Sequence, residues 1–547
     1  MKEREAKLDA PPGFVLPELG QPADGFSAQP QAIRRLRTTY YDTSDLRLAR
    51  WGASLRYRPG EGWTVKLPEL GTDDDGFVAE PLTARRLRTT YYDTSDLRLA
   101  RWGASLRWRP GEGWTVKLPE GTDGALLVRA EHTFPGDGNR PPAAARALIR
   151  PFVRTAQLSP SVRMRTLRRP VELSDPEGAR LAEVVDDEVQ VLDGRRILAR
   201  FRELEVELDP SATTGLLAKV IDRLVEAGAR TSEPTPKYLR ALGGRERAHG
   251  HEVVQPEVDA DASVQELLRH DLAGGTLRLF RHEAGVRTGE DPEAVHQARV
   301  ATRRVRSTLR TFSELLDEEW TDRLRADLKW LADLLGQVRD TDVLLERLSG
   351  HLAGLPPGDQ KAGRRLLAML NEQRDQARRR LLGAMGTEKY VELLEDLVAA
   401  AAAPALLPGA DRPADEVMPP LVRKPWKRLR KEVRKAGDDP PDEELHKIRI
   451  RAKRARYAAE AVEPVFGESA GNFADAVADI QSVLGDHQDA VVGEAWLREA
   501  ASASRRDVAL VAGMLIAAER AAAATTRDSW RAVWEAADRK QLRAWLG

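Results

Sequence analysis

Charged residues recur at every second position in several short segments of the first half of the sequence. In EREAKL, at residues 3–8, Glu3, Glu5 and Lys7 follow one another two positions apart. In FRELEVEL, at residues 201–208, three glutamates alternate with apolar residues. Because successive side chains of a β-strand point to opposite faces, each segment predicts a strand with one densely charged face.

Basic residues show the same spacing in other predicted strands. SLRYR, TVK, LLVRAEHTF and VRMRTLRR contribute the following same-face pairs: Arg56 with Arg58, Thr64 with Lys66, Arg129 with Glu131, and Arg163 with Arg165. Carboxylates suit Mg²⁺ or Mn²⁺, and guanidinium groups suit phosphate oxygens. The sorting of acids and bases onto different strands therefore favours a site for a metal and a phosphate group. The alternative is that each segment is the solvated face of an amphipathic strand.

The elements that would position these residues belong to a large chain of balanced charge. It has 547 residues, of which 41% are hydrophobic, with 86 basic residues, 86 acidic residues and no cysteine. This length supports roughly two to four domains, and the balanced charge gives no general attraction to nucleic acid. The lack of cysteine excludes disulfides and thiolate ligands and suits a reducing cytoplasm. We expect neither a signal peptide nor a membrane span, because the start is charged and the apolar stretches at 397–407 and 508–524 are short.

The pattern of apolar and polar residues changes near residue 245. Residues 1–243 contain short β-like runs separated by Gly, Pro and Asp, including a DG hairpin signal in VLDGRRI at residues 191–197. Residues 244–261 are polar and predict a linker, and residues 262–547 show a helical period near 3.6. The helical part is expected to form two related halves, at about residues 262–403 and 418–547.

The charged segments of the first part resemble the CYTH family, the triphosphate tunnel metalloenzymes. EREAKL matches the ExExK signature of that family. YYDTSDLRLARWGASLRYR, TVKLP, FRELEVEL and TPKYLRAL follow in the family's order, so that the resemblance covers roughly residues 1–243. It implies an α+β domain in which an eight-stranded antiparallel β-barrel with flanking helices forms a charged tunnel. It also implies hydrolysis or rearrangement of triphosphate groups with Mg²⁺ or Mn²⁺, without a covalent protein intermediate.

The same resemblance implies a role for each charged set. The catalytic residues would be Glu3, Glu5 and Lys7, and the metal ligands would be Glu3, Glu5, Glu203 and Glu205. Phosphate would be bound by Arg107, Arg109, Lys117, Arg129, Arg163, Arg165 and Lys237, or, in the first copy of a repeat, by Arg56, Arg58 and Lys66.

That repeat is a tandem duplication of 51 residues, at 16–66 and 67–117. Each copy carries about three predicted strands, whereas one tunnel needs one such set. An odd number of extra strands would reverse every later strand, so both copies cannot join one otherwise unchanged barrel. We expect the second copy to fill the tunnel, because it leads directly into LLVRAEHTF. The first copy would then be extruded, or it would complete a neighbouring molecule as a domain-swapped homodimer.

Two helical segments, at residues 295–312 and 445–462, carry a histidine followed by basic residues along one stripe. The first stripe is His296, Arg299, Arg303, Arg306 and Arg310, and the second is His446, Arg449, Lys453 and Arg456. Such stripes are often solvated faces or form salt bridges between helices. Four or five cations on one stripe without an acid repel each other, however, which favours a polyanion lying along it. Asp291 and Pro292 predict the start of the first helix.

These paired helices resemble the CHAD domain, the conserved-histidine α-helical domain. Their partner segments are LLGQVRDTDVLL, which contains Arg339, and VLGDHQDAVV, and the resemblance covers about residues 262–545. It implies two four-helix bundles around a basic channel in which both stripes and Arg339 bind inorganic polyphosphate. Glu460 and Gln488 occupy the positions of Arg310 and Arg339 in the second half. The second stripe is therefore expected to bind less tightly or only to frame the groove.

Together the resemblances predict a cytoplasmic protein that binds polyphosphate. One of the hypotheses below places it at polyphosphate granules. The leading hypothesis is a metal-dependent inorganic triphosphatase tunnel whose helical domain recruits or senses polyphosphate or tripolyphosphate. One alternative is a non-catalytic granule-binding module with an idle tunnel. Another is a nucleotide or thiamine triphosphate-processing enzyme of the CYTH family. A nucleic-acid partner is disfavoured, because the charge is balanced and no aromatic stacking pattern is evident.

Overall fold

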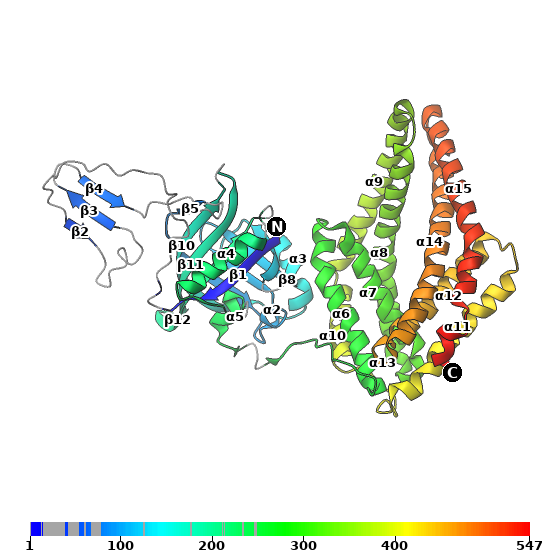
Figure 1. The fold of residues 1–547 in the computed structure, drawn as a ribbon, viewed down its shortest axis with the longest axis horizontal. Coiled ribbons are helices and arrows are strands. Elements are labelled where there is room, and N and C mark those ends of the chain that lie inside the picture. Colours follow the sequence, from blue (N-terminus) through cyan, green and yellow to red (C-terminus); the bar gives the residue numbers. More distant parts are fainter. Residues whose placement is uncertain are drawn as a thin grey trace. The chain divides into compact units, whose positions relative to one another are not determined.

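The chain divides into two compact units, Met1–His251 and Glu252–Gly547, each of which is described by itself. The computed structural model describes residues 2–11, 14, 39–41, 54–58, 62–66, 78–123, 126–175, 178–209, 212, 214–231, 235–245 and 249–547. The first unit is rich in strands and the second is helical (Figure 1). The expected antiparallel sheet in the N-terminal half and the helical C-terminal half are thereby confirmed.

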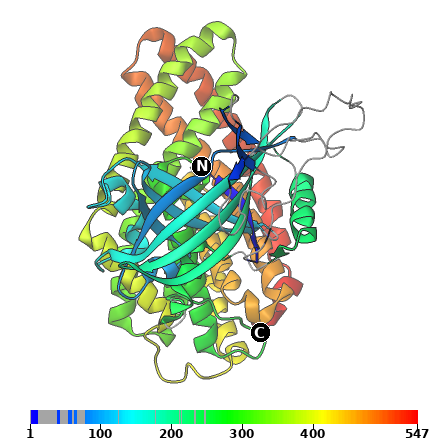
Figure 2. The same cartoon turned by 90° about the vertical axis from the view of Figure 1, so that its left-hand side faces the viewer.

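The first unit is built around a ten-stranded antiparallel sheet (Figure 2). Its strands are β1 (Lys2–Asp9), β5 (Val78–Pro81), β6 (Arg85–Asp93), β7 (Ser105–Arg109), β8 (Gly113–Asp123), β9 (Leu126–Phe134), β10 (Ser159–Ser174), β11 (Arg180–Asp193), β12 (Arg196–Leu208) and β13 (Arg230–Thr231). Eight strands pair in the order β11, β12, β1, β9, β8, β7, β6, β10, and β10 pairs again with β11. The pairing thus returns to the strand from which it began, while β5 adds to β10 and β13 to β1.

One face of this sheet is apolar and packs against a helix. The helices of the first unit are α2 (Arg98–Arg101), α3 (Ala143–Val153), α4 (Thr214–Glu226) and α5 (Lys237–Leu242). Leu8 of β1 and Val206 of β12 share a buried core with Val220 and Leu224 of α4. Each fully buried side chain of this size contributes about 1.5–3 kcal/mol to folding, so the alternation that buries the apolar residues also directs the charged ones to the other face.

The register of β1 fixes which charged residues meet on that other face. Lys7 lies opposite Glu205, and Glu5 lies opposite Glu207 in the neighbouring strand β12. On its other side, Glu3 lies opposite Arg129 of β9. The period-two prediction for EREAKL and FRELEVEL therefore corresponds to adjacent, paired strands.

The turn between β11 and β12 follows the predicted DG signal. Asp193 pairs with Arg196, and Gly194 adopts a φ of 56°, in the left-handed region that glycine enters without a steric penalty. The hairpin predicted at residues 191–197 is thereby confirmed.

The structure separates the strands of the two repeat copies into different sheets. The second copy supplies β6, β7 and β8 of the ten-stranded sheet. The first copy supplies β2 (Thr39–Tyr41), β3 (Ser54–Arg58) and β4 (Gly62–Lys66), which form a three-stranded sheet of their own. Within each copy the pairing is equivalent: Arg56 lies opposite Thr64, as Arg107 lies opposite Thr115.

The YYDTSDL motif of the second copy is held by a buried carboxylate. Asp93 accepts hydrogen bonds from the backbone N–H groups of Thr94, Leu99 and Ala100 at 2.7, 2.8 and 3.0 Å. It also accepts one from the Tyr238 hydroxyl at 2.9 Å. Burial raises the pKa of Asp93, and these donors oppose that effect. The motif thus joins the turn after β6 to helix α5.

The second unit consists of helices throughout its length. They are α6 (Val264–Thr288), α7 (Pro292–Thr311), η2 (Ser313–Leu315), α8 (Glu318–Ala353), α9 (Pro357–Met385), α10 (Glu388–Ala402), α11 (Ala414–Ala436), α12 (Asp442–Glu460), α13 (Glu463–Phe466), α14 (Glu468–Ser502), α15 (Arg506–Ala537) and η3 (Gln541–Leu546). Both predicted histidine-bearing helices are present, as α7 and α12.

Helix α7 begins where the sequence predicts. The Asp291 side chain accepts a hydrogen bond from the N–H of Glu293 at 2.9 Å, and Pro292 occupies the first helical position. The predicted apolar stripes of the two helices are buried; they are Ala298, Thr302, Val305, Leu309 and Phe312 in the first, and Leu445, Ile448, Ala452, Ala455 and Ala459 in the second.

Helix α15 is long and apolar enough to cross a membrane by length and composition, a property that core helices share. One of its faces is packed: Val508, Val511 and Leu515 lie in a core with residues of α8, α9 and α14. Its Glu519 is buried and forms an ion pair with Arg347 of α8 at 2.6 Å. The helix expected at residues 508–524 is present, but it is longer than the sequence predicts, and 28% of its most apolar part is buried.

The separate sheet of the first copy leads to a prediction for a deletion. Removing residues 16–66 should leave the ten-stranded sheet and its unfolding transition intact, because the strands of that sheet come from β1 and from residues 78 onward. Circular dichroism and thermal unfolding of the shortened chain would test this. Loss of the cooperative transition would show instead that the first copy is required for folding.

Candidate functional site

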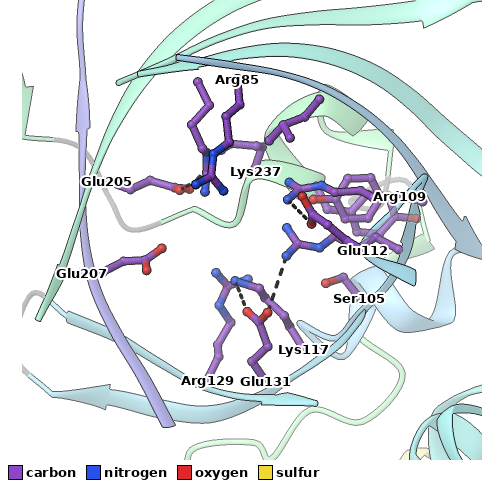
Figure 3. A pocket seen from close by; sticks show the side chains of 15 residues that line it. Arg85, Ser105, Arg109, Glu112, Lys117, Arg129, Glu131, Glu205, Glu207 and Lys237 are labelled. Atoms are coloured by element: carbon purple, nitrogen blue, oxygen red, sulfur yellow. Dashed lines mark hydrogen bonds and ion pairs between the residues drawn. The ribbon is translucent and has the colours of Figure 1, made fainter. Parts of the chain in front are cut away.

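A cavity of 290 Å³ lies within the first unit, and side chains from several strands and from α5 point into it (Figure 3). Its basic lining residues are Arg85, Arg107, Arg109, Lys117, Arg129, Arg168 and Lys237, and its acidic ones are Glu112, Glu131, Glu205 and Glu207. Seven basic residues against four acidic ones make the cavity suited to an anionic ligand.

Lys237 is the centre of a buried charge network on one side of the cavity. It begins α5, and its ammonium group donates to Asp187 of β11. The same nitrogen lies 3.0 Å from Glu203 and 3.2 Å from Glu205, both on β12. All four side chains are almost fully buried. One ammonium group thus compensates three carboxylates that would otherwise be buried close together.

Two further cations, Lys7 and Arg168, also belong to this network. The Lys7 ammonium group donates to Glu205 and lies 3.9 Å from Glu203. Arg168 of β10 makes a two-nitrogen contact with Asp187, at 2.7 and 3.0 Å, and also lies 3.0 Å from Glu205. Such paired, charge-assisted contacts offset the cost of burying the ions.

The pKa values in the network follow from this balance. Burial raises the pKa of Glu205, but Lys237 and Lys7 outweigh burial and hold it well below its ordinary value. Burial also raises the pKa of Glu203, and there the effect of burial prevails over the same two lysines. Glu205 therefore stays ionised to a lower pH than Glu203.

The other side of the cavity is built around Glu131 of β9. Lys117 lies 2.7 Å from one of its carboxylate oxygens, and Arg107 lies 3.6 Å from the other. Burial raises the pKa of Glu131, but Lys117 and Arg107 outweigh it, so the pKa is lowered. Arg109 is held separately, by a 2.9 Å hydrogen bond to Thr89. The cations on this side are thus partly balanced within the cavity.

Most of the phosphate-binding residues predicted for this part meet in the cavity, but two do not. Arg107, Arg109, Lys117, Arg129 and Lys237 line it. Arg163 and Arg165 of β10 are exposed and lie on the opposite face of their strand, so their placement with the others was wrong. Near the start of β10, the alternation of side chains instead places Val162 and Met164 in a buried apolar core with Tyr91 and Tyr238.

The cavity also contains charged residues that the sequence reasoning did not assign. Arg168 is the arginine that β10 supplies, and Arg85, Glu112, Glu131 and Glu207 also line the cavity. Glu207 could have been found, because it continues the period-two run. Glu203, which was predicted to bind the metal, does not line the cavity; it is buried beside Lys237.

A divalent cation would need oxygen ligands from these carboxylates. Among the described side chains, no group of three or more His, Cys, Asp or Glu residues is arranged to hold a metal. The side chains of Glu3 and Glu5 lie outside the described residues. The backbone nevertheless places Glu5 directly opposite Glu207, next to Glu205. Carboxylates directly opposite each other on paired strands repel, and a cation between them would relieve this repulsion. The expected Mg²⁺ or Mn²⁺ stays a prediction.

The first copy carries the equivalent basic residues on a separate sheet. Arg56 and Arg58 lie on β3 and Lys66 on β4, and their side chains lie outside the described residues. Their strands pair only with one another among the pairings that the structure describes. The structure therefore places the second-copy set, and not the first, in the cavity.

In the second unit, the two histidine-bearing helices bring their basic stripes together. Arg449 of α12 lies close enough to Arg303 of α7 to contribute to the lowered pKa of Arg303, and both arginines contribute to the lowered pKa of Lys453. Arg299 belongs to the same group and forms a 2.9 Å ion pair with Asp340 of α8. We call Arg299, Arg303, Arg449 and Lys453 the interhelical basic cluster.

The interhelical basic cluster is electrostatically unfavourable without an anion. Burial lowers the pKa of Lys453 to about 7, together with Arg449 and Arg303. Burial likewise lowers the pKa of Arg303. The Nε atoms of Arg303 and Arg449 are buried and have no hydrogen-bond partner within the described residues. Buried donors without acceptors are costly, which makes them candidates for ligand contact.

The histidines at the heads of the stripes lie at partly buried positions. Burial lowers the pKa of His296, and the neighbouring Arg339 and Arg303 lower it further. This places Arg339 of α8 beside the first stripe, as predicted. The Nδ1 atom of His446 is buried and lacks a hydrogen-bond partner in the described part of the chain.

The glycines of the LLG and VLG segments lie against equivalent arginines. A Cβ at Gly336 would lie 3.7 Å from the Arg299 guanidinium, and one at Gly485 would lie 3.6 Å from that of Arg449. A longer side chain at either position would occupy the place of the guanidinium. The two halves therefore use the same packing to hold one arginine each.

The remaining predicted cations separate into two groups. Arg306 lies near Arg325, and Arg310 lies near Arg306, Arg325, Arg451 and Arg454; burial, together with Arg454, lowers the pKa of Arg310 to about 10.

Arg456 instead forms a 2.5 Å ion pair with Glu460, which also binds Arg304 at 2.9 Å. Glu460, which stands where the first stripe has Arg310, thus neutralises the C-terminal end of the second stripe.

Comparison with known proteins decides the family. The CHAD domain model matches residues 271–498. The uncharacterized protein Rv2226 of Mycobacterium tuberculosis (strain ATCC 25618 / H37Rv) is 32% identical over 457 residues, which cover 78% of this chain and 84% of that protein. The chain belongs to the family of Rv2226, and residues 271–498 form a CHAD domain.

Two solved structures are also similar to the chain. PptA from Streptomyces chartreusis is 25% identical, covers 50% of this chain and all of that one, and gives a TM-score of 0.43. The CHAD domain from the plant Ricinus communis is 29% identical, covers 52% of this chain and 96% of that one, and gives a TM-score of 0.43.

The CHAD domain contains every residue predicted to bind polyphosphate, from His296 to Arg456. The predicted resemblance to CHAD is thus confirmed. The resemblance of the first unit to the CYTH family stays a prediction that rests on its motifs.

Lys237 should be essential for the stability of the first unit. Lys237→Met leaves three buried carboxylates without their shared cation, which should lower the free energy of unfolding by about 3–5 kcal/mol. Urea unfolding, followed through hydrogen exchange of peptides in β11 and β12, measures this loss. Arg195→Met, in the exposed hairpin turn, removes one positive charge and should change the stability by less than about 0.5 kcal/mol. Equal effects of the two variants would contradict the role of the network.

Lys453 should make polyanion binding by the CHAD domain depend on pH. A bound anion favours the charged lysine, whose pKa in the free protein is about 7. Affinity for long-chain polyphosphate should therefore be full below pH 7 and fall as the pH rises, by roughly tenfold at pH 9 if one charged contact of about 1.5 kcal/mol is lost.

The matched variants are Lys453→Arg, which should remove this pH dependence, and Lys447→Arg, an exposed lysine on the same helix, which should keep it. A titration calorimetry series from pH 7 to 9 measures both. A pH dependence that persists in Lys453→Arg would show that another group titrates.

Proposed function

We propose that the protein is a polyphosphate-associated, metal-dependent triphosphatase of the cytoplasm. In this proposal the ring of strands encloses a tunnel that binds a triphosphate, and the CHAD domain binds inorganic polyphosphate. The observation that carries it is the cavity of the first unit, where seven basic side chains from six elements converge with four carboxylates. A convergence of this kind suits phosphoryl groups that bring a cation with them.

The cations beside Glu131 would hold the substrate phosphates. Lys117 and Arg107 share one carboxylate, so each keeps donors that a phosphate oxygen could accept. Arg109 is oriented by Thr89 and lies on the same strand as Arg107. Fixed donors of this kind stabilise charge that develops on phosphate oxygens during phosphoryl transfer.

Glu5, Glu205 and Glu207 are the residues that would hold Mg²⁺ or Mn²⁺. When bound, such an ion would neutralise phosphate oxygens and activate a water molecule for hydrolysis. Lys7 and Lys237 keep Glu205 ionised, which suits a metal ligand and not a general acid. Glu3, opposite Arg129, would complete the acidic side of the site.

The CHAD domain would hold a polyphosphate chain along the interhelical basic cluster. Burial and the neighbouring arginines lower the pKa values of Lys453 and Arg303, and a bound polyanion would offset this repulsion. The Nε donors of Arg303 and Arg449 would gain acceptors from the phosphate oxygens. The Arg304–Glu460–Arg456 ion pairs make the second stripe shorter than the first.

A second candidate function is a binding module with an idle tunnel. It is favoured by Glu205, whose carboxylate already contacts Lys7, Lys237 and Arg168. A metal ion would have to compete with these cations for one of its ligands. In that case the protein would bind polyphosphate, for example at granules, without hydrolysing it.

Phosphate release distinguishes the two functions. The full-length protein should release phosphate from tripolyphosphate or long-chain polyphosphate when Mg²⁺ or Mn²⁺ is present and not when EDTA is. Glu5→Ala should reduce this release by at least about a hundredfold, because the loss of one preorganised charged group costs about 2.7 kcal/mol or more in the transition state.

The matched control is Glu226→Ala, an exposed glutamate at the end of α4, which should leave the rate unchanged. Preferred hydrolysis of ATP would favour a nucleotide-processing enzyme. No release from any substrate, with polyphosphate still bound, would exclude the triphosphatase and leave the binding module.

A further inference from the structure

A second pocket of the first unit lies outside the cavity described above. It has a volume of 460 Å³ and lies between the end of β6, helix α3 and the loops at residues 139–141 and 156–158. Four arginines line it, namely Arg140, Arg146, Arg150 and Arg154. No acidic residue lines this pocket in the described part of the chain. Its electrostatic character is therefore wholly basic, in contrast to the mixed lining of the first cavity.

The arginines of α3 are spaced to follow an extended anion. Arg146 and Arg150 lie four residues apart within α3, so they stand on successive turns. A rise of 1.5 Å per residue separates them by about 6 Å along the helix axis. Arg154 follows directly after the last helical residue, Val153, and Arg140 lies on the neighbouring loop, so the four arginines together offer contacts to more than one phosphate group.

Arg154 is held in an unusual backbone conformation at the end of α3. Its φ is 51° and its ψ is −111°, a region that side-chain-bearing residues rarely adopt. Its side chain is only 8% exposed, and its guanidinium donates to the Pro151 carbonyl at 3.0 Å. Backbone strain of this kind collects at ligand sites, where the surrounding structure fixes it.

The opposite wall of the pocket is fixed by β6. The Tyr92 hydroxyl donates to the Gly138 carbonyl at 3.0 Å, which ties down the loop that carries Asn139 and Arg140. Arg163 of β10, which the first cavity excludes, lies near this wall, because it affects the ionisation of Tyr92. A fifth arginine therefore adds positive charge beside the pocket.

We propose that this pocket is a second anion site, which binds an inorganic oligophosphate of three or more phosphates outside the tunnel. The absence of carboxylates from its lining distinguishes it from a site for a metal-bound triphosphate, so it would bind the chain without hydrolysing it. It shares its ligand class with the proposed function but does not depend on catalysis. Guanidinium groups on successive helical turns would each contact a different phosphate.

Hydrogen exchange of the full-length protein tests this proposal. In EDTA, which prevents metal-dependent hydrolysis, tripolyphosphate should slow exchange in peptides that cover residues 135–158. The double variant Arg140→Ser, Arg146→Ser should lose this slowing, while peptides from β8 and β9 should keep theirs. Both arginines are exposed and have no ion-pair partner among the described residues, so their loss should not unfold the protein.

The matched control is Arg195→Ser, Arg196→Ser, which removes two exposed arginines from the β11–β12 turn and should keep the slowing. Slowing that persists in the pocket variant, or that is absent from the wild-type protein, would overturn the site. Slowing by ATP but not by tripolyphosphate would overturn the inorganic ligand. Because phosphate release is measured separately, a failure here is distinct from a failure of the proposed triphosphatase.

Discussion

The architecture of the first unit depends on burying like charges next to their counterions. Helix α5 supplies the decisive pair of side chains. Lys237 compensates three carboxylates of β11 and β12, while the adjacent Tyr238 stacks on Tyr91 and donates to Asp93 of β6. One short helix thus joins two parts of the strand ring that are distant in sequence. Three carboxylates can be buried side by side only when a cation such as Lys237 compensates their charge.

The two units handle positive charge in opposite ways. In the cavity of the first unit, the cations beside Glu131 and Glu205 already contact carboxylates, so part of the positive charge is balanced before any ligand binds. In the CHAD domain, the interhelical basic cluster has Asp340 as a partner of Arg299, while burial and mutual repulsion still lower the pKa of Lys453 to about 7. In the proposed function, the first arrangement would receive a substrate together with a metal ion, and the second would receive a bare polyanion.

The duplication shows how a barrel-like sheet accepts extra sequence. Two nearly identical copies have the same internal pairing, yet only the second is continuous with β9 in the chain. The strands of the second copy occupy the places next to β9 and β10 in the ten-stranded sheet, and the surplus copy forms a sheet of its own. Chain connectivity, and not residue chemistry, therefore decides which set of arginines lines the cavity.

The sequence by itself determined the charged faces, the start of α7, the hairpin turn and the two histidine-bearing stripes, because these follow from local periodicity and capping. The resemblance to the CYTH family implied five of the seven cavity cations, namely Arg107, Arg109, Lys117, Arg129 and Lys237. The sequence could not determine which face of β10 lines the cavity. Arg163 and Arg165 were therefore predicted to lie there, whereas Arg168 of the opposite face lines it.

Nor could the sequence reveal that Glu203 is buried beside Lys237 or that Glu460 holds Arg304 and Arg456, because these contacts join distant segments. Only the tertiary structure brought together the arginines of the second pocket, which lie on a helix, a loop and a cap. Burial and charge compensation are properties of neighbours in space, and local periodicity does not specify those neighbours.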